Sequence, residues 1–247
     1  MFRILLFLII SMWMAFQLVG CGGGSSDISA FPWNNPNSLV LMYHFDEPTG
    51  PTANNSQGDF LTGSLSGVSR VAGKLGQGLM FSQTGGVIDV DRTSYKGAPL
   101  DLESGAFSLD FWVKPDTLDA GAYYTLVSND WFIFLINDGQ LELLTRNGAT
   151  WQTALLGVQT LVTGVWQHIA LVVDGTTITY YMNGVEDSSI IATYTFSPNY
   201  NNWDIGSYYD TTSHSYTYTF QGTMDEVRFH NFALTVNEIN NYVQQTQ

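Results

Sequence analysis

The sequence predicts an all-β sandwich or barrel built from many short antiparallel strands. Dipeptides that are typical of tight hairpin turns recur along the chain, and the segments between them alternate apolar and polar residues with a period of two. Several short strands separated by such turns favour a sandwich or a barrel. The turn dipeptides are Asp138-Gly139, Asn147-Gly148, Asp174-Gly175 and Asn183-Gly184.

The composition excludes several classes of protein. The 247 residues include 8 Lys and Arg against 22 Asp and Glu, which gives a formal net charge of -14. Hydrophobic residues make up 45% and charged residues 12%, so the chain can bury a large core and is neither disordered nor a charged coiled coil. Nucleic acid is not an expected partner, because phosphate binding needs a basic face.

The first twenty residues predict a lipoprotein signal peptide. Arg3 precedes an apolar run from Ile4 to Phe16, and Leu-Val-Gly-Cys at 18–21 resembles the lipobox of bacterial lipoproteins, whose cysteine is diacylated and becomes the new N-terminus. Cys21 is the only cysteine in the chain, so it cannot form an internal disulfide. The apolar run is shorter than the roughly 20 residues that a membrane span needs, which disfavours an uncleaved anchor helix.

We therefore expect the chain to consist of three segments, of which the first is cleaved off. Residues 1–20 are removed, residues 21–37 carry the lipid and act as a flexible tether, and residues 38–247 form one domain. The expected location is the cell envelope, with the domain held at a membrane by its lipid. Gly22, rather than an aspartate, favours the outer membrane or the cell surface by resemblance to Gram-negative lipoproteins.

Three segments have the clearest strand patterns, and one helix is expected. Residues 107–114 alternate strictly, which predicts one face in the core. Residues 165–173 are apolar on both faces and predict a central strand, with residues 176–182 as its hairpin partner. Near the C-terminus, Thr235 and Glu238 form a capping box ahead of apolar residues at helical spacing.

Five motifs follow one another along the chain. They are Leu-Met-Tyr-His-Phe-Asp-Glu at 41–47, Gly-Lys-Leu-Gly-Gln-Gly-Leu-Met-Phe at 73–81, Phe-Ser-Leu-Asp-Phe-Trp-Val-Lys-Pro at 107–115, Gly-Val-Trp-Gln-His-Ile-Ala at 164–170 with Tyr-Met-Asn-Gly at 181–184, and Phe-Gln-Gly-Thr-Met-Asp-Glu-Val-Arg-Phe-His-Asn-Phe-Ala-Leu at 220–234. In this order they resemble the laminin-G-like, concanavalin A-like jelly-roll family, over about residues 38–245. The resemblance implies a concanavalin A-like jelly-roll sandwich of two antiparallel sheets, but no single function, because the fold hosts lectins, adhesion modules and enzymes.

Asp46 and Asp225 are the candidate ligands of a structural calcium ion. Asp46 follows the first strand, Asp225 lies in the last, and terminal strands of a jelly roll are often neighbours. Met224 and Val227 both look like core residues although they are three apart, which predicts a β-bulge at Asp225. Family members often carry calcium near such positions, although Asn55 stands where many have an aspartate. The alternative is that both carboxylates cap turns.

Aromatic residues near turns and strand ends predict a binding surface. Residues 197–220 contain five Tyr, one Trp and three Asn but no Lys or Arg. Sugar rings offer C–H faces to aromatic planes and hydroxyls to polar side chains, and the same mixture suits a protein partner. The alternative is ordinary core and edge packing. The candidate ligand-binding residues are Trp131, Trp151, Trp203, Tyr208, Tyr209 and Tyr216.

The sequence carries no recognisable catalytic pattern. Glycosidases of this fold resemble one another in a Glu-x-Asp-x-Glu or Glu-x-Asp-x-x-Glu strand, which is missing here, and the four histidines are dispersed. We therefore expect not an enzyme but a surface-anchored module that recognises a glycan or a surface protein, with calcium as structural support. The alternatives are a structural envelope lipoprotein without a soluble ligand and, third, a polysaccharide hydrolase.

Overall fold

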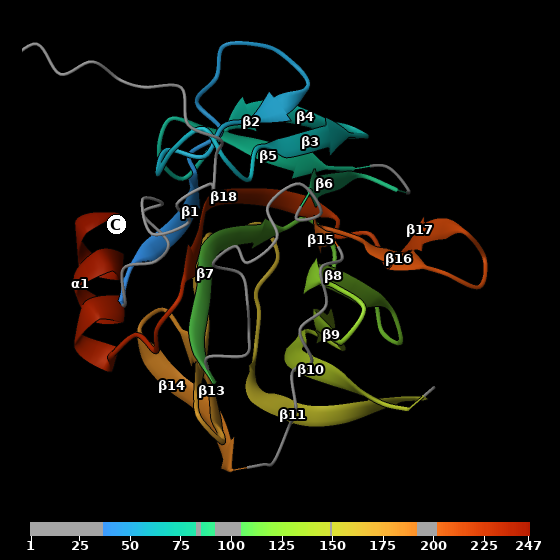
Figure 1. Ribbon diagram of the computed structural model, residues 1–247, viewed down its shortest axis with the longest axis vertical. Coiled ribbons are helices and arrows are strands. Elements are labelled where there is room, and N and C mark those ends of the chain that lie inside the picture. Colours follow the sequence, from blue (N-terminus) through green and yellow to red (C-terminus); the bar gives the residue numbers. More distant parts are fainter. Residues whose placement is uncertain (1–36, 83–84, 92–104, 149, 192–201) are drawn as a thin grey trace, which may run out of the picture. The chain divides into compact units, whose positions relative to one another are not determined.

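The computed structural model describes residues 37–82, 85–91, 105–148, 150–191 and 202–247. The predicted signal peptide, Cys21 and the tether up to residue 36 lie outside the described residues. The described part is a sandwich of two eight-stranded antiparallel sheets with one C-terminal helix (Figure 1). This confirms the predicted jelly-roll fold class.

The first sheet contains both terminal strands of the domain. Its strands are β1 (Leu39–Tyr43), β4 (Val68–Ala72), β5 (Gln77–Phe81), β7 (Ala106–Pro115), β12 (Gln167–Asp174), β13 (Thr177–Met182), β14 (Val185–Ile191) and β18 (Gly222–His230). They follow the order β14-β13-β12-β7-β18-β5-β4, and β1 pairs with β18. The predicted central strand corresponds to β12, which lies between β7 and β13. Its predicted hairpin partner corresponds to β13.

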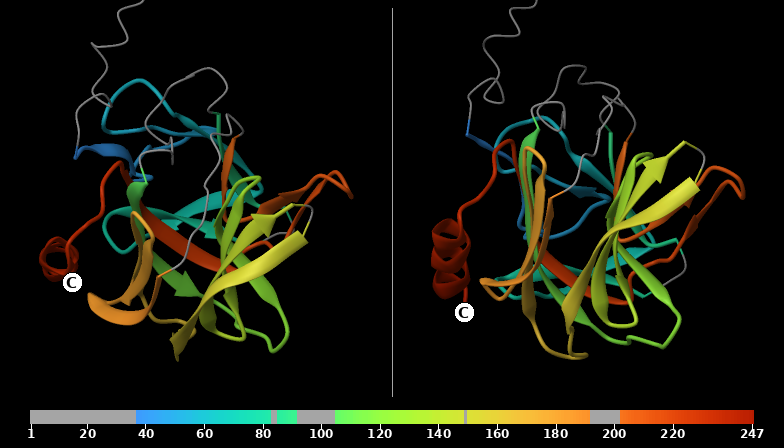
Figure 2. Two further views of the ribbon diagram at one scale, coloured as in Figure 1. Left: turned by 60° about the horizontal axis from the view of Figure 1, so that its bottom comes forward. Right: turned by 90° about the horizontal axis from the view of Figure 1, so that it is seen from below.

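The second sheet faces the first and carries a small hairpin. Its strands are β2 (Thr52–Ala53), β3 (Gly63–Ser66), β6 (Val87–Val90), β8 (Tyr123–Ser128), β9 (Phe132–Asn137), β10 (Gln140–Asn147), β11 (Thr150–Thr160) and β15 (Trp203–Ile205). They follow the order β11-β10-β9-β8-β15-β6-β3-β2, and β16 (Tyr208–Asp210) pairs only with β17 (Ser215–Thr217). Figure 2 shows this hairpin projecting from the sandwich beside the second sheet.

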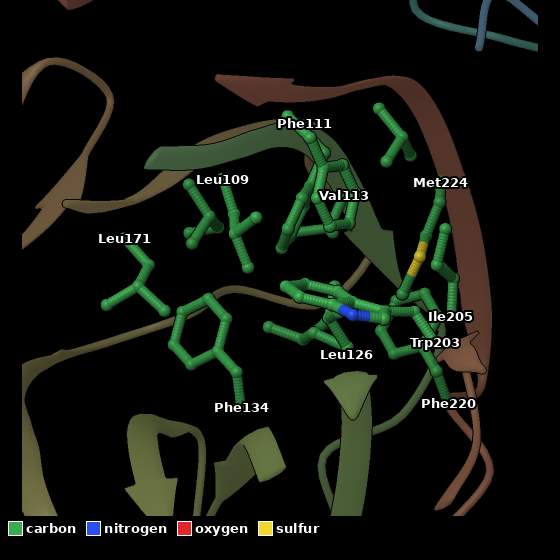
Figure 3. Close-up of a cluster of buried hydrophobic side chains, with 14 of the residues drawn as sticks. Leu109, Phe111, Val113, Leu126, Phe134, Leu171, Trp203, Ile205, Phe220 and Met224 are labelled. Carbon is green, nitrogen blue, oxygen red and sulfur yellow. The ribbon is translucent and has the colours of Figure 1, made fainter. Parts of the chain in front are cut away.

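The core lies between the sheets and contains Trp203. Apolar residues at the odd positions of β7 point into it, as the alternation predicts. Trp203 is fully buried, with its ring against Phe132 and Phe229 at centroid distances of 5.2 and 4.9 Å. Figure 3 shows it among core side chains that include Leu126 and Ile205. The prediction that Trp203 binds a ligand is therefore wrong. Alternation along β15 turns Trp203 and Ile205 inward and leaves only Asp204 facing outward.

The predicted bulge in the last strand is confirmed. The register of β18 against β7 shifts between Asp225 and Arg228, and both Met224 and Val227 are fully buried. Glu226 has a φ of 53°, a left-handed conformation that the bulge imposes. The carboxylate of Glu226 lies 2.7 Å from the Nδ1 atom of His44.

Asn55 holds the edge of β1 that faces away from β18. Its Nδ2 group donates to the carbonyl of Val40, and its Oδ1 atom accepts from the backbone N–H of Met42, at 3.1 and 3.0 Å. The same amide also donates to the carbonyl of Phe60. Because a carboxylate has no N–H groups to donate, an ionised aspartate could not make this set of bonds.

The C-terminal helix covers the outer face of the first sheet. Helix α1 (Val236–Gln245) begins with the predicted capping box, and Ile239 and Val243 pack on Trp112 of β7. No helix within the described ranges is long and apolar enough to cross a membrane.

A buried charge network lies under this helix and joins β7, β12 and β18. Asp110 is fully buried and accepts hydrogen bonds from His168 at 3.1 Å, from His230 at 3.3 Å and from two nitrogens of Arg228. The Arg228 guanidinium lies 3.1 Å from the ring centre of Tyr242 in α1. Burial alone would raise the pKa of Asp110, but the hydrogen bonds of both histidines and the charge of Arg228 hold it well below its ordinary value.

The substitution Asp110→Asn should lower the free energy of unfolding at pH 7 by about 3–5 kcal/mol, because it leaves the Arg228 guanidinium buried without a counter-charge. The difference from the wild type should shrink below about pH 4, since a carboxyl with a depressed pKa loses its stabilising effect as it becomes protonated. Chemical denaturation at both pH values measures this. The exposed Asp116→Asn is the control, and equal stability of wild type and Asp110→Asn at pH 7 would contradict the assignment.

Candidate functional site

The outer face of the second sheet supports the β16–β17 hairpin. Because residues alternate along β9, Phe132 and Phe134 enter the core while Ile133 and Leu135 point outward. The outward residues pack with Tyr208 of the hairpin into a small separate cluster. The hairpin is therefore packed on apolar side chains of the second sheet, and we call this contact its seat.

Two cavities flank this seat. One has a volume of about 410 Å³ and the other about 450 Å³, and both are lined in part by Tyr208 and Thr211. We call the first the acidic cavity, because Asp89, Asp130 and Asp204 line it. The second is the aromatic cavity, which is lined by Tyr123, Ile133, Leu135, Leu144, Arg146, Trp151, Tyr208, Asp210, Thr211, Thr212, Thr217 and Tyr218. Together they form the hairpin groove.

The groove gathers four of the six aromatic residues predicted to bind ligand. Tyr208, Tyr209 and Tyr216 line the acidic cavity, and Trp151 lines the aromatic cavity with Tyr208. The rings are braced against one another, since Tyr209 meets Tyr216 at 5.3 Å and Trp151 meets Tyr208 at 5.7 Å, both edge to face.

Trp131 does not line the hairpin groove, and a role for it in binding stays a prediction. Its side chain is half-buried beside the start of β9, and it lines neither cavity of the groove. The residue reaches the groove only indirectly, because its backbone carbonyl accepts from the N–H of Arg146, which lines the aromatic cavity.

The sequence did not reveal the pair of carboxylates in the acidic cavity. Asp204 of β15 lies directly opposite Asp89 of β6, where two like charges destabilise a sheet. The pKa of Asp204 is raised to about 7, mainly by burial and then by the charge of Asp89. The hydrogen bond that the Tyr216 hydroxyl donates to Asp204 lowers this pKa but does not offset the rise. Burial also raises the pKa of Asp89, although Asn202 donates to it at 2.7 Å. Among the described residues that line this cavity there is no Lys or Arg.

The two candidate calcium ligands converge on one turn instead of lining the groove. Asp46 accepts the backbone N–H of Gln77 at 2.8 Å, and Asp225 accepts that of Leu75 at 2.9 Å. Burial raises the pKa of Asp225 to about 7. In the part of the chain that the structure describes, no group of three or more His, Cys, Asp and Glu residues could hold a metal ion. Both carboxylates accept backbone N–H groups of this turn, as the turn-capping alternative expects.

Comparison with known proteins places the fold. The model of the Laminin_G_3 family, described as concanavalin A-like lectin/glucanases superfamily, matches residues 90–240. The chain belongs to this family. A concanavalin A-like domain fixes the arrangement of the two sheets but not the ligand. No curated protein matches the chain.

Solved structures share the same fold at low identity. Domain 4 of AbnA, an extracellular arabinanase from Geobacillus stearothermophilus in complex with arabinotriose, is 22% identical with a TM-score of 0.61, covering 85% of this chain and all of that one. The binding domain of Paraclostridial Mosquitocidal Protein 1 is 18% identical, with a TM-score of 0.64 over 84% of this chain and 52% of the other. A mutant Trypanosoma rangeli sialidase displaying trans-sialidase activity is 16% identical, with a TM-score of 0.66 over 84% of this chain and 33% of the other.

The substitution Asp204→Asn should stabilise the domain at alkaline pH. A carboxyl whose pKa is raised to about 7 in the folded state disfavours folding increasingly as pH rises from about 4 to 7, because its charged form is desolvated. The amide removes this effect, so the free energy of unfolding should rise by roughly 4 kcal/mol at pH 8 and hardly at all at pH 4. Denaturation at the two pH values measures the change. The exposed Asp116→Asn is again the control, and a gain of the same size at both pH values would refute the explanation.

Proposed function

We propose that this domain is a non-catalytic recognition module that binds a glycan in the hairpin groove. The observation that carries the proposal is the convergence of aromatic rings and hydrogen-bonding side chains on two adjoining cavities. Each cavity is within the usual size range of small-ligand sites. Braced rings such as Trp151 and Tyr209 present flat faces or edges to a sugar at little cost in conformational entropy.

The polar part of the groove suits sugar hydroxyls. Asp89 and Asp204 offer several acceptor atoms within the acidic cavity, and Asn129 and Asn202 line the same cavity with amides. The complex of arabinanase domain 4 with arabinotriose supports the proposal, because a domain of the same fold and similar length holds an oligosaccharide. The proposal includes the absence of catalysis, since the sequence lacks the carboxylate run that glycosidases of this fold share.

A surface protein is the second candidate ligand. Tyr123, Tyr209 and Tyr218 are 39%, 37% and 47% exposed around the hairpin, and exposed tyrosines are common in protein-binding surfaces. The binding domain of the mosquitocidal protein has the same fold. A glycan accounts better for the groove, because a flat protein contact does not require two cavities.

The proposal extends to how the domain is displayed. Lipid attached to Cys21 and the tether of residues 21–37 would hold the domain at the cell envelope, facing outward. Calcium at Asp46 and Asp225 stays a prediction. Its signature would be a melting temperature that rises with calcium and falls with a chelator.

The substitutions Tyr209→Ala and Trp151→Ala should each weaken glycan binding about tenfold or more, because each removes one ring of the groove. Affinity electrophoresis against a panel of envelope and plant polysaccharides measures the loss. Ile191→Ala is the control, since Ile191 is 79% exposed on β14 of the other sheet. Full binding by both groove variants would place the ligand elsewhere.

The substitution Cys21→Ser should abolish lipidation, because serine has no thiol to form the thioether with diacylglycerol. Metabolic labelling with a fatty-acid analogue should give a labelled wild-type band and no label in the variant, which should also leave the membrane fraction. Equal labelling of the two proteins would overturn the lipoprotein assignment.

A further inference from the structure

Arg146 differs from the other arginines that the structure describes. Arg70 pairs with Glu47 at 3.1 Å, and Arg228 pairs with Asp110. Arg146 has no carboxylate partner among the described residues, and its Nε atom, like that of Arg70, is buried without a hydrogen-bond acceptor. An unpaired guanidinium is unexpected in a chain with 22 acidic residues, so its position needs a separate explanation.

The strand register puts this guanidinium in the wall of the aromatic cavity. Arg146 of β10 lies opposite Trp151 of β11, and its guanidinium carbon is 5.2 Å from the centre of the indole ring. Leu144, two residues earlier on β10, faces the same cavity. Stacking on the indole limits the rotation of the guanidinium and leaves its N–H edge free to donate.

The acidic residue that shares this cavity is already engaged. Asp210 accepts the backbone N–H of Thr212 at 2.8 Å and the hydroxyl of Ser213 at 3.0 Å. Both hydrogen bonds lower the pKa of Asp210, and the bond from Thr212 has the larger effect. Its carboxylate therefore caps the hairpin turn and does not form an ion pair with Arg146.

We infer that the aromatic cavity is a subsite for an acidic sugar, whose carboxylate pairs with Arg146 while its ring packs on Trp151 and Tyr208. The planar guanidinium matches a carboxylate with two parallel hydrogen bonds, which a neutral sugar cannot reproduce. This inference rests on the proposed function and adds the chemical class of the ligand. Phosphate or sulfate esters of a sugar present related anionic oxygens, and the experiment separates them from a carboxylate.

The test compares ligands that share one ring and differ in one group. Glucose, glucuronate, glucose 6-phosphate and glucose 6-sulfate are titrated into the isotope-labelled full domain at low salt, with the indole N–H signal of Trp151 as the readout. We expect glucuronate to bind at least tenfold more tightly than glucose and more tightly than either ester. This preference should weaken as the salt concentration rises. Tighter binding of an ester would overturn the carboxylate assignment.

Three variants separate a specific contact from general electrostatics. Arg146→Gln should remove the preference for glucuronate, and Arg146→Lys should restore only part of it, because lysine keeps the charge but not the two-pronged geometry. Lys114→Gln is the matched control, since Lys114 belongs to β7 of the first sheet and its Nζ atom lies 5.2 Å from the ring centre of Trp166. Its preference for glucuronate should equal that of the wild type.

The outcomes distinguish this inference from the proposed function. If glucose and glucuronate bind equally at Trp151, or if Arg146→Gln keeps the preference, the groove binds sugars but the acidic subsite is refuted. If neither the monosaccharides nor the polysaccharide panel perturbs the groove, the proposed function fails and the inference fails with it. A spectrum of folded protein from each variant guards against loss of binding through unfolding.

Discussion

The carboxylate of Asp110 is the contact on which the organisation of the first sheet depends. It bonds to side chains of β12 and β18, the two strands that flank β7, so it fixes the relative position of the sheet's three middle strands. A buried ion pair need not make a fold more stable than apolar packing would. Its geometry favours a single register of the three strands, because any shift would leave a charge buried without its partner. Helix α1 then covers the network through Tyr242.

The two outer faces of the sandwich show what the same alternation rule can produce. On the first sheet, the outward residues of β7 and β12 are sealed beneath α1 by apolar contacts. On the second sheet, the outward residues of β9 pack against Tyr208 of a narrow hairpin. In the described part of the chain this hairpin covers part of the face and leaves a cavity on either side. A helix closes a sheet face more completely than a two-stranded ribbon does. The proposed binding surface therefore lies where the cover is incomplete.

Local patterns in the sequence were enough for the fold and for part of the groove. Alternation, turn dipeptides and the capping box each depend on neighbouring residues, and the spacing of Met224 and Val227 revealed even the bulge. Trp203 was misassigned because a three-residue strand does not disclose which of its faces is buried. The opposition of Asp89 and Asp204 was missed because it depends on β6 pairing with β15, which are far apart in the sequence. Long-range pairing of this kind leaves no local signal.

The attachment of β1 also has a mechanical consequence. Tension applied through the residues before Leu39 enters the domain along β1, which runs antiparallel to β18 and is held on its other edge by Asn55. Such a pull loads the hydrogen bonds of β1 in shear, so several must break together instead of one after another. If the proposed anchor and the proposed ligand pull on the domain at the same time, β1 would therefore resist being stripped from the sheet. The hydrogen bonds of Asn55 to Val40 and Met42 would add to that resistance.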